Sequence, residues 1–182
     1  MPDGAEADVV IGQQAADATN FVHPYVAVDP ATQKVFVGDY RRNRILRFGS
    51  AESLSNGATA EAVLGQADFT SIEPGTAADR LSSMQGLWCD TQGRLWVADS
   101  GNHRVLRFDG AASLASGAPA SGVLGQVNFL NSAPGTSAGT LRYPNGLVTD
   151  ALGNLYVADD GNKRVLRSKQ DKTAVGTSAQ SA

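Results

Sequence analysis

A short polar turn between two apolar segments occurs three times in this chain, at a spacing of sixty residues. The two most similar copies are residues 93–108 and 153–167, and a weaker copy lies at 34–48. In each copy the apolar segments favour β-structure and the polar residues favour a turn, which predicts two short strands joined by a tight connection. Internal similarity at a fixed period indicates a repeat architecture.

The rest of each period predicts two further strands. One precedes the turn unit, as at 86–89, and the other follows it. The following segment, Val-Leu-Gly-Gln or Val-Ile-Gly-Gln, occurs at residues 10–13, 63–66 and 123–126. From Pro24 to Arg167 the period of sixty needs no gap. Four strands with short connections form an antiparallel meander. Because no segment has helical spacing of apolar residues with caps, a helical solenoid is excluded, and the sequence predicts an all-β propeller.

The sequence of the turn unit resembles the NHL repeat. The resemblance is carried by Gly-Asn-Leu-Tyr-Val-Ala-Asp-Asp-Gly-Asn-Lys-Arg-Val-Leu-Arg at 153–167 and by its copy at 93–107. It covers about residues 9–167 and implies a β-propeller that typically has six four-stranded blades. The first repeat departs from the pattern at 40–43, where Tyr-Arg-Arg-Asn replaces Ser-Gly-Asn-His.

This chain supplies three blades, half of a six-bladed ring, with repeats at about 9–48, 63–108 and 123–167. It opens with a lone strand expected at 9–13, and its last blade has three strands. We expect either a head-to-tail homodimer, in which Val9–Gln13 of each chain completes the partner's last blade, or a fragment of a longer chain. Residues 1–8 are expected to be a flexible lead and 168–182 a disordered tail.

Composition excludes several classes of protein. With 182 residues, 42% hydrophobic and 18% charged, the chain is expected to be one folded domain and not a disordered segment. The net charge of −3 argues against a strongly basic nucleic-acid-binding surface. No apolar segment approaches the roughly 20 residues that cross a bilayer. The start of the chain lacks the features of a signal peptide, so the sequence as written is expected to be cytoplasmic, or exported if it has been trimmed.

Aspartate and arginine recur at the ends of the polar turn. The pairs are Asp39 with Arg44, Asp99 with Arg104, and Asp159 with Arg164. Aspartate ends one strand and arginine begins the next, so the two side chains can meet across the hairpin, and we expect structural ion pairs. A second set, Arg47, Arg107 and Arg167, is expected to lie on a sheet face and bridge neighbouring blades.

The sequence offers little for catalysis. Its two histidines, His23 and His103, lie at different levels of the repeat, so no metal site, no cofactor and no catalytic residue are predicted. There is no Gly-x-Ser-x-Gly nucleophile turn and no phosphate-binding Gly-Lys-Ser/Thr loop. The lone Cys89 excludes an intrachain disulfide and is expected to be buried and unreactive. The family's amidating lyases are metal enzymes that use several channel histidines, which this chain does not supply.

The loops at 68–83 and 128–143 and the turns at 40–43, 100–103 and 160–163 are expected to open on one face. Long variable loops are where binding sites tend to lie. The candidate contact residues there are Tyr40, Arg41, Arg42, Asn102, His103, Asn162, Lys163, His23, Tyr25, Gln85, Tyr143 and Asn145. We expect a non-catalytic scaffold that binds a protein, peptide or carbohydrate. The alternatives are an RNA-binding NHL module and a metal-dependent lyase or hydrolase acting in the channel.

Overall fold

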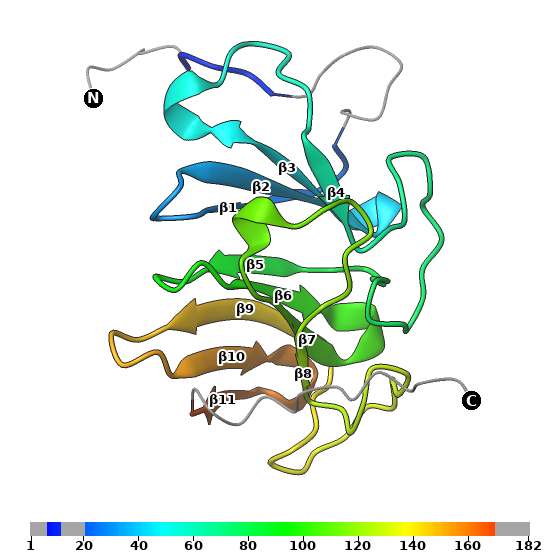
Figure 1. Ribbon diagram of the computed structural model, residues 1–182. Coiled ribbons are helices and arrows are strands. Elements are labelled where there is room, and N and C mark those ends of the chain that lie inside the picture. The colour runs from blue at the N-terminus through cyan, green and yellow to red at the C-terminus, as the bar shows by residue number, and fades with distance from the viewer. Residues whose placement is uncertain (1–6, 12–20, 170–182) are drawn as a thin grey trace.

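The computed structural model describes residues 7–11 and 21–169, which form three antiparallel sheets stacked one beside the next (Figure 1). Each sheet is a meander, and we call the sheets blades 1, 2 and 3. Blade 1 contains β1 (Pro24–Val28), β2 (Lys34–Asp39), β3 (Arg44–Ser50) and β4 (Ala62–Leu64). Blade 2 contains β5 (Gly86–Cys89), β6 (Leu95–Asp99), β7 (Arg104–Phe108) and β8 (Gly122–Leu124). Blade 3 contains β9 (Pro144–Thr149), β10 (Leu155–Asp159) and β11 (Arg164–Ser168). The predicted all-β propeller blades are confirmed.

Two hydrophobic cores of the described residues lie between blades, and a third lies on the outer face of blade 1. Successive residues of a strand point to opposite sheet faces, so Leu95 and Val97 of β6 face blade 1 while Trp96 faces blade 3. The core between blades 1 and 2 includes Phe36, Ile45, Leu64, Leu95, Val97 and Leu106; that between blades 2 and 3 includes Trp96, Val105, Leu155 and Val157. Fully burying one such side chain contributes about 1.5–3 kcal/mol. Neighbouring blades therefore stabilise one another.

The first strand of blade 1 departs from the sixty-residue alignment. β1 pairs Ala27 with Phe36, whereas in blade 2 it is Trp88, sixty-one residues after Ala27, that pairs with Trp96. The gap-free alignment predicted from the sequence is therefore wrong by one residue over this strand. As a result Ala27 faces the core between blades 1 and 2, and Val26, on the other face, is exposed.

The offset has its cause in the turn after the strand. The backbone bond that closes this turn joins Asp29 N–H to the Lys34 carbonyl in blade 1, but Asp90 N–H to the Arg94 carbonyl in blade 2. The blade 1 turn thus contains one more residue. In blade 3 the extra residue is taken up inside β9, whose register with β10 shifts opposite Asp159. The two irregularities cancel, so the repeat length stays at sixty.

Two glycines fix how the fourth strand leaves each complete blade. Gly65 and Gly125 have φ angles of +77° and +90°, in the left-handed region. A Cβ at Gly65 would lie 2.2 Å from Leu81 Cδ1, and one at Gly125 would lie 2.6 Å from Leu141 Cδ1. Both leucines are buried in the cores between blades. The recurring Gly-Gln step therefore packs the inter-blade loop onto the core.

The strand predicted at 9–13 is not formed in its described part. Residues 9–11 have no strand conformation, and 12–13 lie outside the described residues. Val10 instead bonds to the loop after β3: its N–H donates to Asn56 Oδ1 at 2.8 Å, and its carbonyl accepts from Gly57 N–H at 3.1 Å. A strand needs a neighbouring strand to pair with, and none lies beside this segment in the described chain. Most of the predicted lead (1–8) and tail (168–182) lies outside the described residues.

Helical structure in the described residues is limited to short 3-10 turns: η1 (Tyr40–Arg42), η2 (Ala51–Ser53), η3 (Ser100–Asn102), η4 (Ala111–Ser113) and η5 (Asp160–Asn162). Within the same residues, no helix has the length and apolar character needed to cross a membrane.

Candidate binding face

The second and third strands of every blade are joined by one of the turns η1, η3 and η5. Each turn ends on a residue with left-handed backbone, at Asn43, His103 and Lys163, with φ angles of 49°, 54° and 53°. These turns open on the same side of the molecule as the loops 65–85 and 125–143 that join the blades, the right-hand side of Figure 1. We call the turns 40–43, 100–103 and 160–163, these two loops and the starts of the first strands the loop face.

The aspartate that precedes each turn and the arginine that follows it form an ion pair. Arg104 Nε lies 2.7 Å from Asp99 Oδ2, and both side chains are fully buried. The other Asp99 oxygen, Oδ1, accepts the Ser82 N–H at 2.7 Å. Burial raises the pKa of Asp99, and the neighbouring Arg104 charge opposes that rise. The equivalent distances are 2.7 Å for Arg164 Nε to Asp159 Oδ2 and 3.3 Å for Arg44 Nη2 to Asp39 Oδ2.

The same arginines fasten the loops that join the blades. Arg104 donates to the carbonyls of Thr76 at 2.5 Å and Arg80 at 3.0 Å, and also to the carbonyl of Phe129. Since Thr76 and Arg80 lie in the loop before blade 2 and Phe129 in the loop after it, one guanidinium connects both. Arg164 repeats the contacts in blade 3, to the carbonyls of Thr136, Ser137 and Thr140. The recurring Asp–Arg pairs thus hold the loops of the loop face in place, and other residues form its exposed surface.

Neighbouring blades are also linked through the left-handed residue of each turn. Asn43 Oδ1 accepts the Ser83 N–H at 2.8 Å, and His103 Nδ1 accepts the Tyr143 N–H at 3.2 Å. His103 can accept at Nδ1 only when that nitrogen is unprotonated. Burial lowers the pKa of His103, and Arg142 lowers it further. The imidazole ring also meets the Tyr143 ring edge-on, with centroids 4.4 Å apart.

Some predicted contact residues serve the fold. Asn102 and His103 are only 5% and 7% exposed. Asn102 Nδ2 donates to the Gly75 carbonyl and to Asp99 Oδ2, both at 2.8 Å. We therefore assign both side chains to the turn and its neighbouring blade, and we leave them out of the candidate binding surface. Sequence reasoning treated them as surface because polar turn residues are usually exposed.

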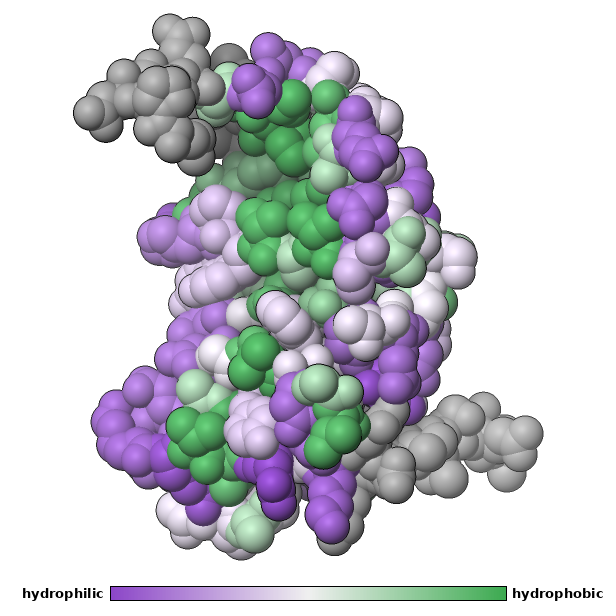
Figure 2. Space-filling view, turned by 90° about the vertical axis from the view of Figure 1, so that its left-hand side faces the viewer, coloured by the Kyte–Doolittle hydropathy of each residue, from purple (hydrophilic) through white to green (hydrophobic). Residues whose placement is uncertain are grey.

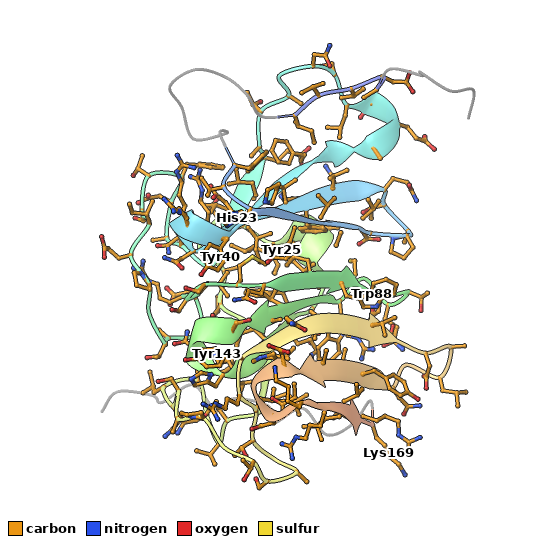
Figure 3. All side chains as sticks on the ribbon, turned by 180° about the vertical axis from the view of Figure 1, so that it is seen from behind. His23, Tyr25, Tyr40, Trp88, Tyr143 and Lys169 are labelled. Carbon is orange, nitrogen blue, oxygen red and sulfur yellow. The ribbon has the colours of Figure 1, made fainter. Side chains whose placement is uncertain are left out.

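Other predicted residues lie at the surface of the loop face. His23, Arg41, Tyr143 and Lys163 are exposed, while Tyr25, Tyr40, Arg42, Gln85, Asn145 and Asn162 are half-buried. The His23 and Tyr40 rings meet edge-on at 5.8 Å, and Arg42 Nη1 lies 3.1 Å from Asp39 Oδ2. His23, Tyr40 and Tyr143 lie on one side of the molecule, away from Trp88 (Figure 3). The surface of this face therefore combines cationic and aromatic side chains.

A groove of about 590 Å³ between the first strands of the three blades was not predicted. Its lining includes Val26, Val28, Leu87, Trp88 and Thr149. Trp88 Nε1 donates to Thr149 Oγ1 at 2.9 Å, which ties blade 2 to blade 3 across the groove. Figure 2 shows the side of the molecule opposite the loop face, where apolar residues gather over its middle. The recurrence of a first strand in each blade could have predicted a groove between these strands. The residues that line it could not be predicted, because β1 is offset by one residue from the first strands of the other blades.

The described residues contain no group of three or more His, Cys, Asp and Glu side chains that could bind a metal ion. Cys89 is buried, and burial raises the pKa of its thiol to about 12, with Asp29 and Asp90 adding to the rise. A thiol with so high a pKa is not a nucleophile at neutral pH.

Comparison with solved structures identifies the fold. The chain is similar to a streptogramin B lyase, with a TM-score of 0.51 and 12% identity over 92% of this chain and 41% of that one. It is also similar to a luciferin-regenerating enzyme, with a TM-score of 0.56 and 15% identity over 87% of this chain and 48% of that one. A chain in a nidogen/laminin complex is similar as well, with a TM-score of 0.53 and 19% identity over 86% of this chain and 47% of that one. The chain spans less than half the length of each. A comparison with curated protein sequences finds no match.

These similarities and the stacked antiparallel meanders define a protein of the β-propeller class. The family model of the NHL repeat matches residues 86–108 and 141–167, the turn units of blades 2 and 3. Blade 1 has the same strand order and the same turn. The chain therefore contains NHL repeats in blades 2 and 3, as its sequence indicated.

Proposed function

We propose that this protein is a non-catalytic propeller scaffold whose loop face binds an acidic segment of a partner protein. The proposal rests on one observation: some loop-face side chains form bonds within the protein, whereas others are exposed to solvent. The recurring aspartates, arginines and Asn102 bond internally, whereas Arg41, Tyr143 and Lys163 point to solvent from three different turns or strand starts. Surface arginine and tyrosine are residues that dominate protein–protein contacts.

Charge favours an acidic partner over a neutral one. Arg41, Arg142 and Lys163 are exposed on this face, and Lys163 pairs with the exposed Asp160 at 3.1 Å. Exposed ion pairs of this kind contribute little and exchange readily with a ligand carboxylate. The exposed Asp68 and Glu73 lie in the loop between blades 1 and 2, so the acid-binding part of the face is expected around Arg142 and Lys163 of blade 3, with Arg41 at its other side.

Selection from a random displayed peptide library tests the proposal. Wild-type protein is expected to enrich peptides rich in Asp and Glu, because these peptides complement the exposed cations. The triple variant R41A/Y143A/K163A should lose that enrichment at least about tenfold, which corresponds to about 1.4 kcal/mol of binding. K169A removes an equivalent charge away from the loop face and is the matched control. No enrichment, or equal enrichment by the triple variant, would contradict the proposal.

Titration with poly(U) RNA separates the RNA-binding alternative. A scaffold for acidic peptides is expected to bind this RNA weakly, since the net charge of the chain is −3. Tight, salt-sensitive RNA binding that the same triple variant abolishes would instead favour the nucleic-acid function.

A further inference from the structure

Residues 9–11 occupy the position of a fourth strand from a blade that precedes blade 1. The Val10 N–H donates to Asn56 Oδ1 at 2.8 Å, and the Gly57 N–H donates to the Val10 carbonyl at 3.1 Å. At the equivalent place in blade 2, the Val63 N–H of β4 donates to Ser116 Oγ at 3.2 Å, and the Gly117 N–H donates to the Val63 carbonyl at 3.0 Å. Val10 is thus bound to blade 1 as β4 is bound to blade 2.

Side-chain packing agrees with this assignment. In the aligned segments Val-Ile-Gly-Gln and Val-Leu-Gly-Gln, Ile11 corresponds to Leu64. Leu64 packs into the core between blades 1 and 2, and Ile11 packs on the opposite face of blade 1, against the core there that contains Leu46 and Val63. Each residue therefore fills the core that follows its own blade.

Blade 3 presents the complementary open edge. In blades 1 and 2 the third strand pairs with a fourth, through Ile45–Leu64 and Val105–Leu124. Among the described residues, β11 pairs with β10 alone. Val165, the residue equivalent to Ile45 and Val105, is 68% exposed, whereas those two are 0% and 1% exposed.

We infer that a second copy of this chain closes the ring, head to tail, with residues 9–11 of each copy completing blade 3 of the other. The register follows from blades 1 and 2: Ile11 lies opposite Val165, Val10 opposite Leu166 and Val9 opposite Arg167. The closure also covers Val26 of blade 1, which is 61% exposed, with the exposed face of blade 3. This inference goes beyond the proposed binding function and does not depend on it.

An arginine that bridges blades supplies a second contact. Arg47 reaches from β3 into blade 2 and donates to the carbonyls of Ala111 and Leu114, at 3.1 and 2.7 Å. Arg167 holds the same position in β11 and is exposed. In the closed ring it donates to the Ala51 and Leu54 carbonyls of the second copy, because η2 and η4 are both 3-10 turns that end on a leucine with extended backbone.

The two open ends of the chain are complementary to each other, which favours a second copy as the occupant. A head-to-tail contact that closes after two copies satisfies both open ends at once.

Light scattering on the eluting particle tests the closure. Wild-type protein is expected at twice the mass of one chain. V165D places a charge in the inferred interface but on an exposed position of the single chain, so it should yield a folded monomer and raise the dissociation constant at least about tenfold. V127D, at a position that is 81% exposed in the loop after blade 2, is the matched control and should remain a dimer.

A disulfide tests the register. Facing residues of antiparallel strands have Cα atoms about 4.5–5.5 Å apart, which suits a disulfide. Oxidised V9C/R167C is expected to give covalent two-chain particles on a non-reducing gel, while V9C/L152C is not, because Leu152 lies in the turn between β9 and β10. A folded wild-type monomer, a V165D dimer, a larger assembly or equal crosslinking of both double variants would overturn the inference.

Discussion

The last residue of the turn between the second and third strands differs from blade to blade: it is Asn43, His103 or Lys163. Asn43 and His103 both have left-handed backbone, and both accept a backbone N–H from the next blade. Lys163 has the same backbone conformation, but an ammonium group donates and cannot accept. Asparagine suits this conformation and this bond without titrating, whereas histidine makes the bond dependent on pH.

His103 should therefore make stability fall in weak acid. Its folded pKa is lowered by burial and by Arg142, so below the unfolded value of about 6.5 the unfolded chain binds more protons. Stability is expected to be constant above that pH and to decline as pH falls toward the lowered folded pKa. Urea unfolding of wild type and H103N between pH 5 and 8 checks this. H103N keeps an acceptor, as at Asn43, and should lose that part of the slope; an unchanged slope would refute the assignment.

The buried ion pairs should differ in strength between blades. R104A leaves the fully buried Asp99 without its partner and frees loop carbonyls on both sides, so a loss of about 3–5 kcal/mol is expected. R164A removes the same group from a side chain that is 27% exposed, and water can replace it. The expected loss there is about 1–2 kcal/mol. Denaturant unfolding measures both, and equal losses would contradict the argument.

At the scale of elements, the sequence predicted the repeated hairpins well because local signals specify them. Residues 95–97 are all apolar, and residues 105–108 are apolar except for Arg107. The segment between them, Ser-Gly-Asn-His at 100–103, contains residues that favour a turn. The sequence could not predict the one-residue offset of β1. The extra turn residue in blade 1 is matched by an extra residue within β9 of blade 3, so the repeat length stays the same. Residues 9–11 have no strand conformation in the single chain, since a strand needs a neighbouring strand to pair with, and we infer that a second copy supplies it.

The burial of Asn102 and His103 shows the same limit at the candidate site. Their spacing identified the turn, but their exposure depends on how the loops 65–85 and 125–143 fold back over it. Those loops have no regular pattern of apolar residues. Arg41 and Lys163, which the sequence also proposed as contact residues, are exposed in the described part of the chain.

The Gly-Gln step after the fourth strand should be intolerant of a side chain. G65A adds a Cβ at a φ of +77° and within 2.2 Å of Leu81 Cδ1. The backbone strain costs about 1–2 kcal/mol and the overlap about 1–3 kcal/mol more. G65A/L81A relieves the overlap but opens a cavity, so it should not restore stability fully. Thermal unfolding of G65A, with G139A as a control in open space, checks the prediction; a G65A protein as stable as G139A would contradict it.

At the scale of the whole molecule, stability depends on how the two open ends are covered. Two of the described cores lie between blades. On the outer face of blade 1, Ile11, Phe21 and residues of the loops cover a third core, whereas no such core covers the outer face of blade 3 in the described residues. Val165 and Val26 are exposed on these faces, although their neighbours in the repeat are apolar and packed. A propeller is stable when the last such face meets the first.

A ring closed by a second copy should melt at a temperature that depends on protein concentration. Binding of one folded chain by another stabilises both by mass action, and a tenfold rise in concentration is worth about 1.4 kcal/mol of association. The melting temperature of wild type is therefore expected to rise by a few degrees from micromolar to hundred-micromolar protein. V165D, which prevents closure, should melt at a lower temperature that does not change with concentration, whereas V127D should follow wild type. A wild-type melting temperature independent of concentration over this range would mean that blade 1 and blade 3 are stable without each other.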